Sequence, residues 1–236
     1  MSEAKGTKAM FDADGAFIDP RGLRRAKRLN ILSGSMGSLW FALCLGSYFQ
    51  LFARNLGATD LDIGLLATIP SMAAVFQIVS AYMVERLGKR KPFWAVAEYT
   101  RRLVLGLMMI LPFVFADDMR TAVVILLVLL GISSILGTAA FSPWYSWMAD
   151  IIPQKERGRF FGIRSAVINV VIIIFLPLFG GILDRYSGDE QWTGFAIVFG
   201  AGTILGLLDL TTHCFIPEPL MKKEREGIDL VTMIAR

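Results

Sequence analysis

Residues 63–91 read IGLLATIPSMAAVFQIVSAYMVERLGKRK, and two features of this stretch decide the fold. The part from Ile63 to Val84 contains no charged residue. About 20 apolar residues, at a rise of 1.5 Å each, form a helix that crosses a hydrocarbon core of about 30 Å. The basic run at residues 86–91 follows at once. Because Lys and Arg flank membrane helices on the cytoplasmic side, the stretch predicts both a transmembrane helix and its orientation.

Similar apolar blocks occur on both sides of this one, so the sequence predicts an all-α membrane protein. Hydrophobic residues make up 55% of the chain and charged residues 19%, which is too apolar for a soluble domain. A β-barrel would need stretches of alternating hydrophobicity, whereas these blocks are continuous. The six expected transmembrane helices span residues 30–53, 63–84, 93–116, 121–148, 160–183 and 192–215.

Basic residues are concentrated in alternate connections between the blocks. They gather before the first block and after the second, fourth and sixth, whereas the other connections hold only Arg54, Arg120 and Arg185. By the positive-inside rule, residues 1–29 form a cytoplasmic N-terminal tail and residues 217–236 a cytoplasmic C-terminal tail. We therefore expect a multi-pass protein of the cell membrane, plasma or inner. Lipid headgroups account for the net charge of +4 without a nucleic-acid partner.

Few residues suit catalysis or metal binding. The chain has one His and two Cys, Cys44 and Cys214, and both cysteines lie inside apolar blocks. This is too little for a disulfide framework or a metal site. Nor does the chain hold a Gly-x-Ser-x-Gly nucleophile motif. We expect no enzyme activity, no metal and no cofactor.

The connection after the second block carries a recognisable motif. Residues 81–91 read AYMVERLGKRK. This resembles Gly-x-x-x-Asp-Arg-x-Gly-Arg-Arg, the signature loop of the major facilitator superfamily (MFS), with Ala81 and Glu85 in place of the first Gly and the Asp. That family carries the loop on the cytoplasmic side between its second and third helices, where the charge distribution independently places it here.

Two other stretches are similar to the same family. Residues 147–159 resemble the exit from its fourth helix and the Arg-Gly entry to its fifth. Residues 176–181, LPLFGG, resemble the Gly-Pro-x-x-Gly-Gly of the fifth helix in its antiporters, with Leu176 in place of a Gly. The resemblance implies a six-helix MFS half-bundle of two inverted three-helix repeats. An acid–Arg pair followed by Gly ends both the second and the fifth block, which are the second helices of the two expected repeats. So short a pattern also arises by chance.

The resemblance also assigns a role to the loop motif. A carboxylate at a helix end beside a basic turn can exchange ion-pair partners and so hold one arrangement of helices. The alternative is that the basic residues only fix the topology. The residues of this conformational latch would be Ala81, Glu85, Arg86, Gly88, Lys89 and Arg90, with Asp150 and Arg157 as partners.

An ionisable cluster lies inside the third and sixth blocks. A charge in a membrane helix costs a few kcal/mol unless it is paired or functional. The expected cross-bundle pair joins Asp209 to one of two arginines of the third block. We interpret the cluster as a structural ion-pair network, because the family keeps its third and sixth helices away from the central cavity; a proton relay is the alternative. The cluster comprises Glu98, Arg101, Arg102, Asp209 and His213.

Uncharged polar residues are candidates for the lining of a translocation cavity. By resemblance, the first and fourth helices line this cavity, and the second and fifth meet the other half. Hydrogen-bonding groups in an apolar surround suit a neutral or amphipathic small solute, but small residues equally let helices pack closely. The candidates are Ser33, Gly37, Trp40, Tyr48, Gln50, Gln77, Ser134, Thr138 and Asn169.

The resemblance therefore implies transport of a small solute by alternating access, with this chain as one half of a secondary transporter. Residues 217–236 resemble the start of the family's central linker. The expected partner is a second six-helix half, and this chain is then a fragment of a longer transporter, a split-gene subunit with its partner on a separate chain, or a half that forms a homodimer. The alternative is a non-transporting membrane scaffold or assembly factor with the same fold.

Overall fold

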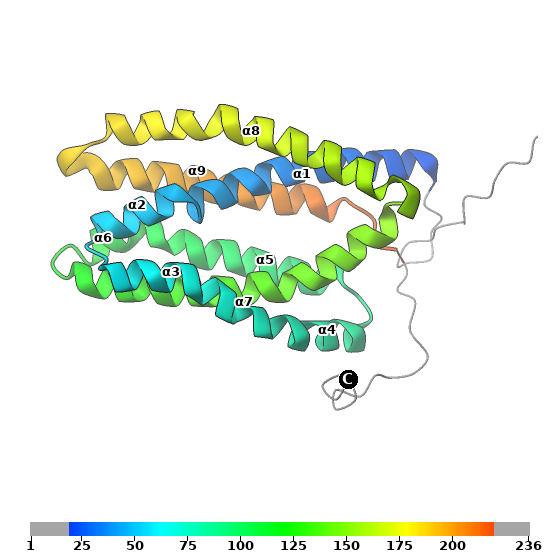
Figure 1. Cartoon of the computed structure of the whole chain (residues 1–236), viewed down its shortest axis with the longest axis horizontal. Coiled ribbons are helices and arrows are strands. Elements are labelled where there is room, and N and C mark those ends of the chain that lie inside the picture. Colours follow the sequence, from blue (N-terminus) through cyan, green and yellow to red (C-terminus); the bar gives the residue numbers. More distant parts are fainter. Residues whose placement is uncertain (1–18, 220–236) are drawn as a thin grey trace, which may run out of the picture.

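The computed structural model describes residues 19–219, and its elements are helices (Figure 1). The expected tails fall largely on residues 1–18 and 220–236, outside this part, and the side chain of Glu85 is also outside it. The long helices run side by side along one axis. In chain order they are α1 (Pro20–Cys44), α2 (Ser47–Asn55), α3 (Asp60–Met72), η1 (Ala73–Val75), α4 (Phe76–Leu87), α5 (Lys91–Gly106), η2 (Leu107–Ile110), α6 (Leu111–Val114), α7 (Met119–Ile151), η3 (Gln154–Glu156), α8 (Arg157–Arg185), η4 (Gly188–Glu190) and α9 (Gln191–Cys214).

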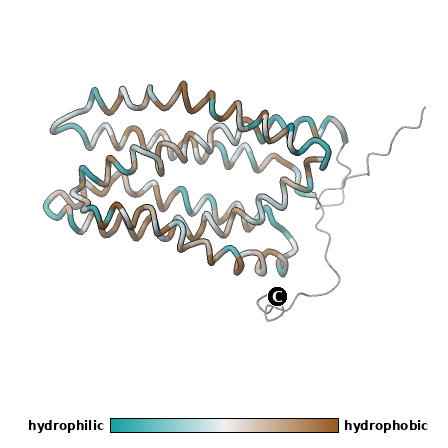
Figure 2. Tube along the Cα trace, in the orientation of Figure 1, coloured by the Kyte–Doolittle hydropathy of each residue, from teal (hydrophilic) through white to brown (hydrophobic). Residues whose placement is uncertain are grey.

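Five helical segments of the described part are long and apolar enough to cross a membrane. They are residues 21–55, 60–84, 119–151, 154–185 and 188–214. The remaining predicted helix, residues 93–116, forms α5, η2 and α6, and it carries three charged residues near its start. Figure 2 shows the consequence of this composition: the trace is mostly apolar along the helices and hydrophilic at both ends of the bundle.

Local sequence signals explain where the first helix begins. α1 starts at Pro20, well before the expected start at Asn30. The Asp19 side chain accepts a hydrogen bond from the Gly22 N–H at 2.5 Å, and proline is favoured in the first turn. Hydropathy reports where a chain is apolar and not where a helix is capped, so residues assigned to the tail belong to α1.

Breaks divide the first three predicted helices. Residues 30–53 form two helices, α1 and α2, which separate at Leu45 and Gly46. A short 3-10 turn, η1, follows Pro70, and a second one, η2, precedes Pro112. Proline removes a backbone donor and crowds the preceding turn, so these bends have an identifiable cause. α7 and α8 also contain a proline, Pro143 and Pro177, but continue as α-helices.

The helices pack in two groups. α1 contacts α9 and α8, while α7 contacts α5, α3 and α4. α5 and α9 join the two groups, which lie above and below one another in Figure 1. Glycines permit the closest approach, because a Cβ built at Gly202 or Gly206 would lie 2.8 Å from the nearest atom of Cys44 or Trp40 on α1.

The predicted cytoplasmic connections meet at one end of the bundle. Lys27 of α1 forms an ion pair with Glu156, at the turn between α7 and α8. Arg90, at the turn between α4 and α5, contacts Glu218 beyond the end of α9. At the opposite end, Arg120 Nη1 lies 2.5 Å from Asp62 Oδ2 and ties α7 to α3.

Candidate functional site

Two adjoining cavities lie between the two groups of helices. The first, of about 380 Å³, is lined by residues of α1, α5, α7, α8 and α9. The second, of about 520 Å³, is lined by residues of α1, α2, α3, α4, α5 and α7, with Ala74 of η1. Both are partly open, and they share four lining residues: Phe41, Arg101, Gly137 and Phe141. We call the two together the central groove.

Most of the predicted cavity-lining residues face this groove. Tyr48 does not: its hydroxyl donates to the Leu176 carbonyl at 2.7 Å and fastens α2 to α8. Asn169 is exposed on α8 and lines neither cavity. The others are Ser33, Gly37 and Trp40 in the first cavity, and Gln50, Gln77, Ser134 and Thr138 in the second.

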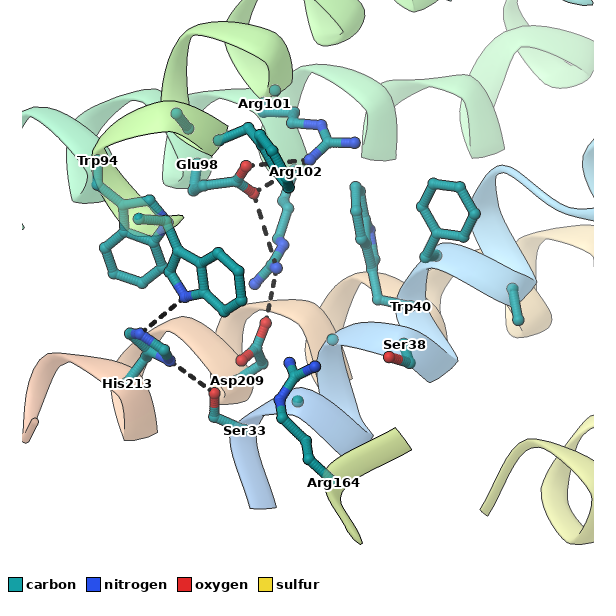
Figure 3. A pocket seen from close by; sticks show the side chains of 18 of the residues that line it. Ser33, Ser38, Trp40, Trp94, Glu98, Arg101, Arg102, Arg164, Asp209 and His213 are labelled. Carbon is teal, nitrogen blue, oxygen red and sulfur yellow. Dashed lines mark hydrogen bonds and ion pairs between the residues drawn. The ribbon is translucent and has the colours of Figure 1, made fainter. Parts of the chain in front are cut away.

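The ionisable cluster also lines the groove, contrary to the expectation that it would lie away from the cavity (Figure 3). Glycines on α1 and α7 explain why long side chains of α5 and α9 reach it. Asp209 lies directly against Gly37, and Arg101 lies against Gly137. Any larger residue at either glycine would occupy the space that these charged groups fill.

The expected ion pair across the bundle is formed by Arg102. Its Nη2 lies 2.6 Å from Asp209 Oδ2, and its other terminal nitrogen donates to the Gly206 carbonyl. Glu98 lies between the two arginines of α5, 3.0 Å from Arg101 and 3.7 Å from Arg102. The side chains of Arg102 and Asp209 are only 7% and 9% exposed. This network joins the two helix groups across the α5–α9 contact.

Trp40 forms the wall behind the two arginines. Its ring centroid lies 4.8 Å from Arg101 Cζ and 4.7 Å from Arg102 Cζ, and the residue is 2% exposed. Cations over an indole face are attracted by its quadrupole, more strongly where water is scarce. Trp40 therefore holds both guanidinium groups in place.

His213 is fixed in its neutral form by its partners. The indole N–H of Trp144 donates to Nε2 at 3.1 Å, so Nε2 must be unprotonated. Nδ1 then carries the proton and donates to Ser33 Oγ at 2.8 Å. A second proton on the ring would point at the N–H of Trp144. This geometry favours a structural role for His213 over a relay.

Arg164 was given no role in the sequence interpretation, although it is the single charge in residues 160–183. It reaches from α8 into the first cavity, with Cζ 5.6 Å from the ring centroid of Trp144. Among the described side chains, no carboxylate lies within 4.0 Å of it. A lone charge in an apolar block is costly unless it is paired or functional, so the position of Arg164 in the sequence is itself a signal for a functional residue.

At the end of the bundle where the basic turns meet, Arg90 lies at the centre of the residues that were predicted to form a latch. Its Nη1 lies 2.7 Å from Asp150 Oδ2 and 2.9 Å from Ser146 Oγ. Its backbone N–H donates to Glu218 Oε1 at 2.5 Å. Arg90 is 2% exposed, so the turn before α5 is anchored to both α7 and the segment after α9. Glu218, in a Pro-Glu-Pro sequence, had not been predicted to contribute.

The other residues predicted for the latch make separate contacts. Gly88 ends α4 with a φ of +66°, a left-handed conformation that favours glycine. Arg86 lies over the Tyr82 ring, with Cζ 4.7 Å from its centroid, and Lys89 is exposed. Arg157 donates to the Ile152 carbonyl at 3.0 Å and to the Ala149 carbonyl at the end of α7. Ala81 is half-buried in α4, and the side chain of Glu85 lies outside the described part.

The sequence profile of the Major Facilitator Superfamily matches residues 22–232, nearly the whole chain. Neither the curated proteins nor the solved structures contain a match. The profile covers the loop motif, the groove and the ionisable cluster together. The chain is therefore a membrane-embedded protein that belongs to the major facilitator superfamily, a family of membrane transporters.

Proposed function

We propose that the chain moves a small solute across the membrane by alternating access, as one six-helix body that rocks against a second one. The central groove carries this proposal. It lies between the two helix groups, it is partly open, and polar groups of both groups converge on it. Alternating access needs two bodies around one site, so the proposed partner is a second six-helix half, on the same polypeptide, on another chain or in a homodimer.

Six transmembrane helices are part of the proposal, with α5, η2 and α6 as the third. Its three charges argue for this placement, because Glu98, Arg101 and Arg102 pair within the bundle and need not contact lipid. The packing supports an inverted repeat. α1 contacts α9 and α8 in the way that α7 contacts α5 and the α3–α4 segment. α1 and α7 are the first helices of the two proposed three-helix repeats. Each of them thus contacts the second and third helices of the other repeat.

We place the bundle in a cell membrane, plasma or inner, with both ends of its chain on the cytoplasmic side. The basic start of α1, the turn before α5 and the turn before α8 lie at one end, as the ion pairs of Lys27 and Arg90 require. By the positive-inside rule this end is cytoplasmic. The groove would then open alternately toward this end and toward the Asp62–Arg120 end.

Uptake into vesicles tests the proposed function. The chain is reconstituted with and without a cross-link between copies, and accumulation of a mixed pool of labelled small solutes is followed by mass spectrometry. We expect uptake from assembled copies and none from vesicles that hold only monomers. Robust uptake by the monomer would contradict the two-body mechanism. A stoichiometric protein partner without any flux would favour the scaffold alternative.

We further propose that Arg90 and Asp150 form the latch. Asp150→Asn removes one charge of a pair whose acid is 48% exposed, and such a pair is worth about 0.5–1 kcal/mol. The equilibrium between closed and open forms should shift roughly two- to fivefold. Labelling of Ser134→Cys by an impermeant maleimide from the cytoplasmic side should accelerate by that factor, with Cys44 and Cys214 replaced by Ala.

Asp60→Asn is the matched control for this latch. Asp60 pairs with Arg54 at the opposite end of the bundle, where both side chains are exposed. We expect an unchanged labelling rate in this variant. An unchanged rate in Asp150→Asn as well would show that the Arg90 pair only fixes the turn.

A further inference from the structure

The central groove has more positive than negative charge. Three guanidinium groups line its first cavity, those of Arg101, Arg102 and Arg164, against the two carboxylates of Glu98 and Asp209. His213 is neutral, as its hydrogen bonds require. One positive charge is left over. Uncharged residues had suggested a neutral or amphipathic solute, but these side chains change the chemistry of the site.

The excess charge can be assigned to a particular residue. Both terminal nitrogens of Arg102 are engaged, by Asp209 and the Gly206 carbonyl, and Arg101 has Glu98 as its partner. Arg164 has no carboxylate within 4.0 Å among the described side chains. Figure 3 shows it extending from α8 to the neighbourhood of Asp209, whose Oδ2 already binds Arg102.

Arg164, and in part Arg101, retain guanidinium donors for a ligand. The Nε atoms of all three arginines, Arg101, Arg102 and Arg164, are buried and have no hydrogen-bond partner. A buried donor without a partner is destabilising, and more so when the group is charged. An oxyanion is the ligand that satisfies such groups, because the planar guanidinium fork matches carboxylate and phosphate oxygens.

Glycines keep both arginines against the walls and leave the groove open. A Cβ built at Gly34 of α1 would lie 2.5 Å from Arg164 Nη2, and one at Gly137 of α7 would lie 2.6 Å from Arg101 Cζ. Each head group therefore rests on the backbone of a central helix. Trp144 lies behind Arg164, and Trp40 lies behind Arg101. The cavity of about 380 Å³ remains in front of them.

We propose that the groove binds a small anionic solute through its oxyanion group, a carboxylate or a phosphate, held by Arg164 with Arg101 as the second donor. The inference rests on the proposed transport function and names its substrate class. Arg102 and Asp209 position the site and do not contact the anion. One excess positive charge suits a solute with one negative charge.

Ligand-induced stabilisation of the purified chain tests this assignment. Acetate, lactate and inorganic phosphate serve as anions, and glucose and choline as neutral and cationic probes, all at one ionic strength held with chloride. We expect an anion to raise the melting temperature and to change the fluorescence of the tryptophans with saturation. Acetate or lactate acting alone would identify the carboxylate, and phosphate acting alone the phosphate.

Variants of Arg164 separate this site from general anion effects. Arg164→Gln should weaken anion binding at least tenfold, and Arg164→Lys less, because it keeps the charge and loses the fork. Gly34→Ala keeps every charge but displaces the head group, so it tests the site even if Arg164→Gln fails to fold. Arg159→Gln, at an exposed position of the same helix, should leave binding unchanged.

The outcomes distinguish this inference from the proposed function. Anion binding that survives both Arg164→Gln and Gly34→Ala would overturn the inference, as would saturable binding of glucose or choline alone, or no response to any anion. Anion binding without flux from any assembled form would uphold the site and overturn transport. Flux of neutral or cationic solutes only would uphold transport and overturn the anion site.

Discussion

Asp209→Asn is expected to lower the free energy of unfolding by about 3–5 kcal/mol, the cost of breaking a buried ion pair by removing one partner. The variant keeps the shape of the side chain but leaves the Arg102 guanidinium, 7% exposed, without its closest acid. The pair also joins α5 to α9, where the two helix groups meet. Unfolding in mixed micelles by added SDS measures the loss.

A double-mutant cycle identifies the pair as the cause. Arg102→Met alone should also be strongly destabilising, whereas the double variant should lose much less than the sum of the two. Asp60→Asn, in an exposed pair, should change stability by no more than about 1 kcal/mol. A loss below that size in Asp209→Asn would refute the assignment. If the variant folds normally yet all transport is lost, the proton relay replaces the structural interpretation.

Trp40→Ala is the second large effect, with an expected loss of about 3–5 kcal/mol. Trp40 is 2% exposed and is among the largest fully buried side chains. Its removal leaves a cavity and also removes the aromatic face behind Arg101 and Arg102. We therefore expect weaker anion binding as well as lower stability, both measured on the same purified sample.

Leu32→Ala is the matched control on the same helix, because Leu32 is 53% exposed. Its expected loss is below about 1 kcal/mol. Trp40→Phe should be intermediate in stability, since it retains an aromatic face with less volume. Equal stability of Trp40→Ala and the parent chain would show that α1 does not pack against the arginines as described.

The sequence was sufficient for the helical class, the positions of the apolar segments and the family, because hydropathy and charge distribution act over whole helices. Helix ends and breaks depend on a few atoms. Asp19 caps α1, which therefore begins about ten residues before the start that hydropathy predicts. At 1.5 Å per residue, the difference is roughly 15 Å of helix. The interruption at Gly46 depends on the close approach of its backbone to the Ala42 carbonyl, which no hydropathy pattern reveals.

The site was predicted less completely than the fold. The spacing of Glu98, Arg101 and Arg102 predicted their pairing, because neighbours on one helix follow from periodicity. That these charges face the groove depends on the glycines opposite them, Gly37 and Gly137, which lie on other helices. Arg164 shows the same difficulty. Its sequence position marked it as unusual, but its partners come from distant segments.

The pairing of α1 with α8 and α9 has a consequence for biosynthesis. α1 leaves the ribosome before α8 and α9, the helices that it packs against. Until α9 is inserted, Arg102 has no Asp209 and Trp40 has no Gly206 beside it. The helices α3, α4, α5 and α7 can pack together as soon as α7 is inserted, whereas α1 remains exposed to lipid until α8 and α9 are inserted. Nascent chains arrested before α9 should therefore be substrates for membrane quality-control proteases.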